Sequence, residues 1–176
     1  MTDALRVLSD DWVLFRGYAN RRGEVDHLLI GHRGVWAIEV KARPVCVHVD
    51  GDRWSYEKFD RYGNRVDEGS LEDRRGRSWG RQVSDIAGDL EAFLRSRGQD
   101  VDVRTAVVIL HDRATLGAVR GLEIDLVCAG AGYLLERLGD EAPVLDSPRC
   151  SAVARLVRRD HAFHAQRRRQ RRGARS

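Results

Sequence analysis

The alternation of apolar and polar residues predicts a series of strands in the first third of the chain. Stretches rich in β-branched and aromatic residues are separated by turns that contain glycine. The predicted strands cover residues 11–19, 24–30, 35–41, 44–49 and 53–59. A short helical segment over residues 2–8 precedes them. We therefore expect an antiparallel meander of four or five strands.

The middle of the chain changes from turn-forming to helical sequence. Residues 60–77 have many turn formers and no apolar period, so we expect an exposed loop. A helix should begin near Ser78 and end at Gly98. Its apolar stripe consists of Val83, Ile86, Leu90, Phe93 and Leu94. This stripe should lie on the sheet.

Strands and helices alternate in the rest of the chain. Strands are predicted over 103–110 and 122–129, a helix over 132–138, and a final helix from about Pro148 into the C-terminal tail. A meander followed by such alternation predicts an α/β fold, with a mixed sheet flanked by helices. We expect one domain over residues 1–154, followed by a basic helix and tail over 155–176.

Composition excludes a membrane-spanning protein and indicates a globular one. The 176 residues are 42% hydrophobic and 33% charged, and no apolar run approaches the roughly 18 residues that a span needs. The first residues lack the apolar stretch of a signal peptide, so we expect a cytoplasmic location. The three cysteines are far apart, without the spacing of a metal-binding site, and should be reduced and buried.

Positive charge is concentrated at the C-terminal end. From Arg155 onward the chain has nine Arg and one Asp, or +8, whereas the rest is −4 within a net charge of +4. Such a run favours a polyanion, and nucleic acid is the expected partner. The arginines predicted to bind it are Arg167, Arg168, Arg169, Arg171 and Arg172. The alternative is a solvated terminal helix.

The Gly-His-Arg-Gly turn at 31–34 sets the register of the hairpin that it closes. If the turn is symmetric, the numbers of opposite residues sum to 65. Asp26 then lies opposite Glu39, and Glu24 lies opposite Lys41. The other face should be apolar and cover the core, interrupted by His27. Its members are Val25, Leu29, Trp36, Ile38 and Val40.

Two opposed carboxylates predict a metal site. Like charges directly across a strand pair repel, whereas a divalent cation shared by Asp26 and Glu39 would stabilise them. Mg²⁺ suits these oxygen ligands, with Mn²⁺ as an alternative, and the Val40 carbonyl could be a further ligand. The other interpretation is an exposed cross-strand cluster of charges without a metal.

Lys41 strengthens the chemical interpretation. Of 31 basic residues only Lys41 and Lys58 are lysine, so the chain uses arginine almost wherever a positive charge suffices. A lysine is a compact donor whose pKa can fall on desolvation, so it can orient or deprotonate an attacking water.

These residues resemble a known family. Asp26, followed thirteen residues later by Glu39-Val40-Lys41, is similar to the core of the restriction-endonuclease-like phosphodiesterases. The stretch "GEVDHLLIGHRGVWAIEVK" resembles the nuclease-related (NERD) domain. The resemblance implies a nuclease in which Asp26 and Glu39 bind Mg²⁺, Lys41 positions the nucleophilic water, and Gln82 faces the same cleft. It also implies nucleic acid as substrate, DNA rather than RNA.

One feature departs from this family pattern. Such nucleases often supply another acid from a longer helix before the first strand, whereas the predicted helix here is short and holds only Asp3. The alternative function is therefore a nuclease-fold module that binds nucleic acid without hydrolysing it. A third is an interaction domain with an incidental acidic cluster.

Two further groups of residues are not assigned to the nuclease site. His161 and His164 share a helix face but lack a third metal ligand. Trp79 should cover the core or stack on a base.

Overall fold

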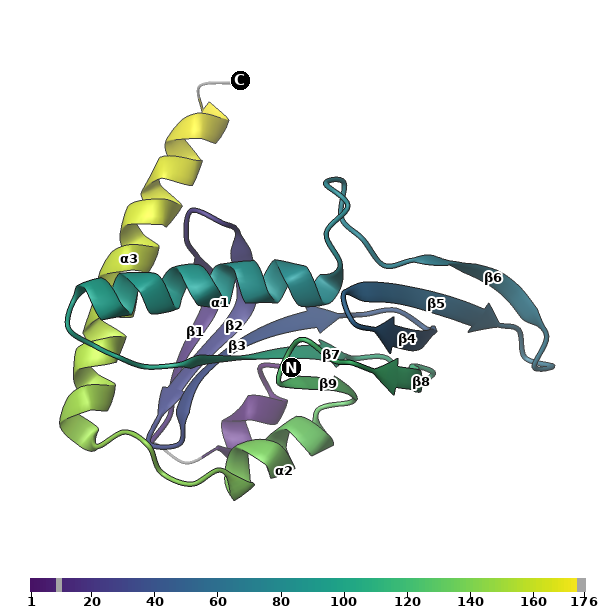
Figure 1. The fold of residues 1–176 in the computed structure, drawn as a ribbon, viewed down its shortest axis with the longest axis horizontal. Coiled ribbons are helices and arrows are strands. Elements are labelled where there is room, and N and C mark those ends of the chain that lie inside the picture. The colour runs from purple at the N-terminus through teal and green to yellow at the C-terminus, as the bar shows by residue number, and fades with distance from the viewer. Residues whose placement is uncertain (9–10, 174–176) are drawn as a thin grey trace.

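Two β-sheets form the scaffold of the protein (Figure 1). The computed structural model describes residues 1–8 and 11–173, and the side chains of all of these except 168, 169 and 171–173. The central sheet has the strand order β1-β2-β3-β7-β9. Its strands are β1 (Val13–Ala19), β2 (Glu24–Gly31), β3 (Gly34–Lys41), β7 (Val103–Ile109) and β9 (Leu126–Ala129).

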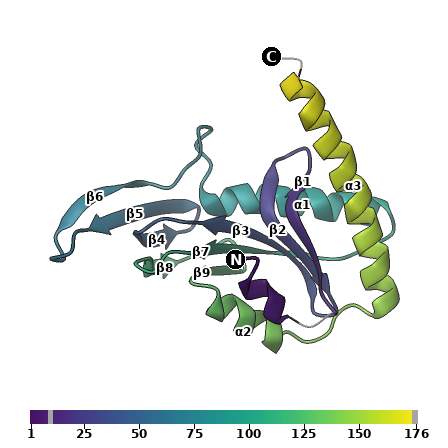
Figure 2. The same ribbon diagram turned by 180° about the vertical axis from the view of Figure 1, so that it is seen from behind.

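The second sheet, called the arm sheet, extends from the body beyond one end of α1 (Trp79–Ser96) (Figures 1 and 2). Its strand order is β6-β5-β4-β8. The strands are β4 (Cys46–Asp50), β5 (Arg53–Phe59), β6 (Arg65–Ser70) and β8 (Thr115–Arg120). Both sheets combine antiparallel and parallel pairs, so the predicted mixed α/β fold is confirmed.

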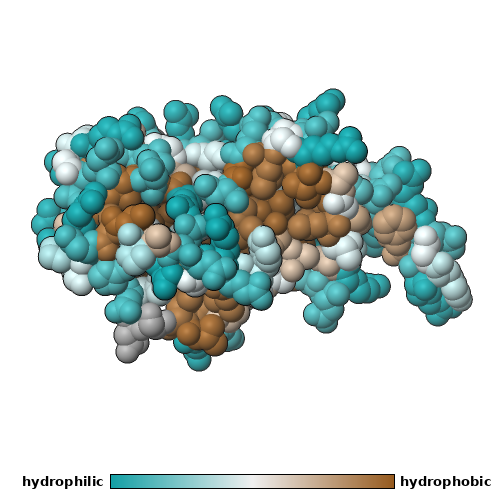
Figure 3. All heavy atoms as spheres, turned by 60° about the horizontal axis from the view of Figure 1, so that its bottom comes forward, coloured by the Kyte–Doolittle hydropathy of each residue, from teal (hydrophilic) through white to brown (hydrophobic). Residues whose placement is uncertain are grey.

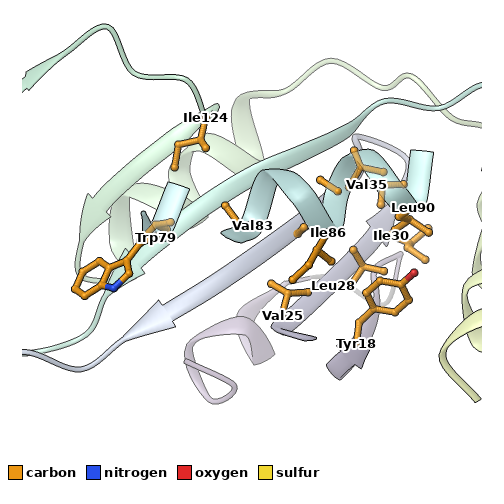
Figure 4. Close-up of a cluster of buried hydrophobic side chains, with 14 of the residues drawn as sticks. Tyr18, Val25, Leu28, Ile30, Val35, Trp79, Val83, Ile86, Leu90 and Ile124 are labelled. Carbon is orange, nitrogen blue, oxygen red and sulfur yellow. The ribbon is translucent and has the colours of Figure 1, made fainter. Parts of the chain in front are cut away.

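The central sheet is covered on both faces. α1 and α3 (Ser147–Gly173) lie on one face, and the 3-10 helix η1 (Ala4–Val7) and α2 (Gly132–Asp140) lie on the other. Figure 4 shows part of the α1 side, where Val83, Ile86 and Leu90 meet strand residues that include Leu28 and Ile30.

This double cover corrects the predicted division of the hairpin into an apolar and a charged face. Leu29, Trp36 and Ile38 pack on the α2 side, as one apolar face would. The opposite face is also buried, because Leu28 and Ala37 pack under α1. The charged residues are therefore confined to the ends of β2 and β3, near the start of α1.

The single meander was also wrong. β2 and β7 occupy the two edges of β3, so the segment after Pro44 cannot pair with β3 and forms β4 of the arm sheet instead. Pro44 lacks a backbone N–H, which favours a break in pairing at this point. The separation places the arm next to the end of β3 that carries Glu39 and Lys41.

Two strands were missed, and one is shorter than predicted. β6 lies within the predicted loop 60–77, and β8 was not expected. Most residues of both strands are exposed, so they have no apolar alternation to reveal them. The strand predicted over 122–129 begins only at Leu126.

The helices agree with the prediction. The Ser78 side chain caps α1 by accepting a hydrogen bond from the Arg81 backbone N–H at 3.0 Å, and Gly98 adopts φ +77° after its end. α3 runs through the predicted boundary at residue 154, and Val157 beyond it is fully buried. The division into 1–154 and 155–176 stays a prediction.

The surface of the protein carries both apolar and hydrophilic side chains. Figure 3 brings the α2 side forward and shows separate apolar patches among hydrophilic side chains. No helix in the described part of the chain is long and apolar enough to cross a membrane.

All three cysteines are free. Cys128 and Cys150 are buried as predicted, whereas Cys46 is half-buried.

Candidate active site at the end of the central hairpin

The predicted register of the hairpin is confirmed. β2 and β3 pair from Gly31↔Gly34 to His27↔Ile38, and every pair sums to 65. The ladder stops there, so Asp26 and Glu39 lie one position beyond its last pair. Pairing of β1 with β2 likewise skips Asp26 and Gly17, which adopts φ +65°. Asp26 therefore occupies an irregular point between two strands, with its side chain exposed.

A hydrogen bond replaces the regular pairing at this point. The Asp26 Oδ2 atom accepts from the backbone N–H of Val40 at 2.7 Å. Val40 lies between Glu39 and Lys41, so this bond holds the Asp26 carboxylate beside both side chains. The irregularity leaves a main-chain donor of β3 available for a side chain of β2.

Glu39 and Lys41 form the half-buried part of the site. The Lys41 Nζ atom donates to Glu39 Oε1 at 2.5 Å, and the two side chains are 19% and 14% exposed. Burial raises the pKa of Glu39, Lys41 opposes this effect, and the negative charge of Asp26 reinforces it. The two carboxylates are thus close enough to interact electrostatically.

Trp79 connects the site to α1. Lys41 Nζ lies 5.4 Å from the centroid of the Trp79 ring, which is buried against Trp54. The expectation that Trp79 covers the core is confirmed, whereas its contact with Lys41 was not predicted. No periodicity reveals that contact, because it depends on how the start of α1 lies over the end of β3.

Gln82 is on the same helix, one turn further along. Its Nε2 atom donates to the backbone carbonyl of Arg77 at 3.2 Å, and the side chain is partly buried. Among the described residues it makes no hydrogen bond to Asp26, Glu39 or Lys41. Its place in the cleft stays a prediction.

The donor set fits a cation that needs few protein ligands. Mg²⁺ commonly binds one or two carboxylates and keeps several waters, which Asp26 and Glu39 could satisfy. The described residues contain no group of three His, Cys, Asp or Glu side chains placed to hold a metal. Asp3 is exposed and pairs with Arg6 at 3.4 Å. The Val40 carbonyl as a ligand stays a prediction.

The predicted basic surface is only partly described. Arg167 is exposed, and its guanidinium lies 5.3 Å from the Phe163 ring. The side chains of Arg168, Arg169, Arg171 and Arg172 lie outside the described ones.

The two histidines of α3 have structural partners. His161 Nδ1 accepts from the Ala19 backbone N–H at 3.2 Å, and His164 Nε2 lies 3.5 Å from Asp160. That the pair does not bind a metal stays a prediction.

Comparison with known proteins places the site within a family segment. A sequence model of the nuclease-related domain (NERD) family matches residues 1–110. This segment runs through β7 and contains Asp26, Glu39, Lys41 and Gln82. No curated protein and no solved structure matches the chain.

Proposed function

Because the chain belongs to the nuclease-related domain family of the restriction-endonuclease-like superfamily, we propose that it is a Mg²⁺-dependent nuclease. It would hydrolyse phosphodiester bonds of nucleic acid, DNA rather than RNA. One observation supports this most directly: the Asp26–Val40 hydrogen bond and the Lys41–Glu39 ion pair gather two carboxylates and one ammonium at the end of a single hairpin.

Asp26 and Glu39 are the residues that would hold the cation. When bound, Mg²⁺ or Mn²⁺ supplies positive charge at the phosphate and lowers the pKa of a coordinated water. Asp26 is exposed and can hold a cation that a phosphodiester reaches from solvent, whereas the Glu39 side chain is 14% exposed and is held by Lys41. Asp26 would therefore be the accessible ligand of the cation, and Glu39 the firmly held one.

Lys41 would position the attacking water. Its ammonium already lies at the Glu39 carboxylate, so a water beside Glu39 is within reach of the same donor. The Trp79 ring limits where the ammonium can move. Lysine also stabilises negative charge that develops on the phosphate oxygens, because its donors point to the same small region.

Polyanion binding would come mainly from the C-terminal helix. The body is net negative, so long-range attraction to nucleic acid must come from local basic surfaces. α3 extends away from the body toward the C-terminus (Figure 1) and exposes Arg167. This position allows the helix to contact substrate beyond the catalytic residues.

A cleavage assay tests the proposal. Supercoiled plasmid, single-stranded DNA and RNA are incubated with wild type in Mg²⁺, Mn²⁺ or EDTA. Cleavage should need the cation and be lost in Glu39→Gln and Asp26→Asn. Glu68→Gln is the matched control, because Glu68 is an exposed acid on the arm, paired with Arg65. Cleavage that persists in EDTA, or in both site variants, contradicts the proposal.

A second candidate function is a nuclease-fold module that binds nucleic acid without hydrolysing it. It is favoured by the presence of only two carboxylates at the site among the described residues, with Lys41 already engaged by one of them. The two functions differ in turnover. Wild type that binds nucleic acid but shows no cleavage with either cation establishes the binding module.

A further inference from the structure

A groove lies between the C-terminal part of α1 and the middle of α3, away from the carboxylate site. Its volume is about 440 Å³, within the range of small-ligand pockets, roughly 300–1,000 Å³. The lining residues are Phe93, Arg97, Leu156, Arg159, Asp160, Phe163 and His164. We call it the α1–α3 groove. It combines apolar and aromatic walls with a cationic rim.

The arginines at this groove are not paired with acids. Within the described part of the chain, Arg97, Arg159 and Arg167 have no ion pair with a carboxylate. Arg95, which is close to Arg97 in sequence, differs in this respect, because its Nε atom lies 3.2 Å from Asp100. Arginines without a carboxylate partner favour an anionic ligand at this place.

The acid that lines the groove is already engaged. Asp160 Oδ2 accepts from the Tyr18 hydroxyl at 2.7 Å, and its other oxygen lies 3.5 Å from His164 Nε2. The Tyr18 hydroxyl is buried, and this bond ties α3 to β1. Asp160 thus serves the packing of α3, and its charge is turned toward the body.

The aromatic side chains at the groove suit planar groups. Phe163 is 54% exposed, although it is a large aromatic side chain. An arginine guanidinium lies over each of the two phenylalanine rings of the groove. The distance to the ring centroid is 5.3 Å for Arg167 over Phe163 and 5.7 Å for Arg97 over Phe93. Exposed aromatic rings beside arginines are the elements with which proteins stack unpaired bases and hold the adjacent phosphates.

We propose that the α1–α3 groove binds single-stranded nucleic acid, with a base against Phe163 and phosphates at Arg97 and Arg159. Single strands are the fitting ligand because only an unpaired base exposes both of its faces. A purely apolar ligand would not pair with the arginines, and a simple anion would not stack on the exposed ring. A nucleotide chain satisfies both.

The groove is a separate site from the carboxylates. Phe93 follows Trp79 by 14 residues on α1, or about 21 Å at 1.5 Å per residue. The inference shares with the proposed function only the class of ligand, and binding in EDTA measures it without any cleavage.

The base contact is tested by fluorescence anisotropy with labelled dT₁₂ and rU₁₂ in EDTA. Phe163→Leu keeps an apolar side chain but removes the ring, and should weaken binding about 5- to 100-fold. Phe163→Trp keeps a stacking surface and should bind within a few-fold of wild type. The DNA and RNA probes show whether the sugar matters. Circular dichroism checks that both variants are folded.

The phosphate contacts are tested by salt dependence in the same assay. Arg97→Ala/Arg159→Ala should reduce the slope of log affinity against log salt by about 1.4, or 0.7 for each lost contact with a single strand. Arg6→Ala/Arg137→Ala is the matched control. Both of its residues are exposed and lie on the other face of the central sheet, so it makes the same change in net charge and should keep the slope.

Three outcomes overturn the proposal. Phe163→Leu binding as tightly as wild type removes the base contact. An equal loss in the groove and control double variants shows that only net charge matters. An unlabelled polyglutamate 12-mer that binds as tightly as dT₁₂, and weakens with the same groove substitutions, assigns the groove to an acidic protein segment instead.

Discussion

The side chain of Asp26 accepts a hydrogen bond from the backbone N–H of Val40, with 2.7 Å between Oδ2 and N. This bond forms where the β2–β3 ladder has ended, so it substitutes for a main-chain pair. It fixes the carboxylate of one strand beside Glu39 and Lys41 of the next. The predictions for the site depend on this relationship.

The first prediction concerns the shared cation. Asp26→Asn keeps the size of the side chain but removes its charge, so its affinity for Mn²⁺ should fall at least about tenfold, since a hard cation needs the anionic oxygens. Calorimetric titration of Mn²⁺ into both proteins measures it. Glu68→Gln serves as the control. Equal affinities in wild type and Asp26→Asn would show that the two carboxylates do not share a metal.

The second prediction separates the charge of Lys41 from its chemistry. Lys41→Arg keeps the positive charge, but the guanidinium is larger and stays protonated, so it cannot take over the handling of the attacking water. Cleavage should fall about 100-fold or more, the usual size of a proton-transfer contribution. Lys58→Arg, an exposed change on β5, is the control. Cleavage within a few-fold of wild type identifies Lys41 as a countercharge only.

The third prediction separates binding from cleavage. Four to six engaged tail arginines give a slope of roughly 4 to 5 in log affinity against log salt for duplex DNA. Deleting residues 165–176 should weaken binding strongly at low salt and flatten that slope, with cleavage at saturating substrate nearly intact. The deletion begins after His164, so the contacts of Asp160 with Tyr18 and His164 remain.

Glu39→Gln should show the opposite behaviour in the same assays. Cleavage should be lost, and affinity kept or raised, because a negative charge near the scissile phosphate is removed. If the deletion leaves the salt slope unchanged, the tail is a solvated helix. If neither variant changes binding or cleavage, the hairpin charges have no role in nuclease chemistry.

The fourth prediction concerns the pH dependence of stability. Glu141 follows α2 and pairs with Arg104 of β7 and Arg137, and the hydrogen bond from Arg104 lowers the pKa of Glu141. A folded-state pKa below the unfolded value, ordinarily about 4.3, means that the pair stabilises the fold above that pH. The stabilisation is lost as the pH falls through the lowered pKa.

Glu141→Gln should therefore reduce the free energy of unfolding by about 1 to 2 kcal/mol at pH 7. The difference from wild type should shrink as the pH falls below 4. Urea unfolding at several pH values measures both, and Glu136→Gln, an exposed change on α2, is the control. A difference that stays constant across this range assigns the effect to packing and excludes the ion pair.

The register of the β2–β3 hairpin and the bounds of α1 could be predicted from residues close together in the chain. The glycines at 31 and 34 define the turn, and the period of two then allows one register that keeps Leu28 opposite Ala37. The Ser78 cap and the apolar stripe define α1 in the same way. These features depend on residues close together in the chain, so the sequence alone could predict them.

Features that depend on contacts between distant segments were not predictable. β6 and β8 lack apolar alternation because they are largely exposed, and only pairing with β5 and β4 makes them strands. The assignment of β4 to the arm follows from the parallel pairing of β3 with β7, more than sixty residues later in the chain. Pairing of this kind depends on which edges are free after folding.

The residues of the candidate chemistry could be identified without a structure: Asp26, Glu39 and Lys41 stand at the ends of two strands whose register follows from one turn. Their surroundings depend on the folded chain. The tertiary structure placed Glu39 and Lys41 under the start of α1, gave the Val40 N–H to Asp26, and brought α1 and α3 together to form the groove. Register depends on neighbouring residues, whereas burial and hydrogen-bond partners depend on segments that meet only after folding.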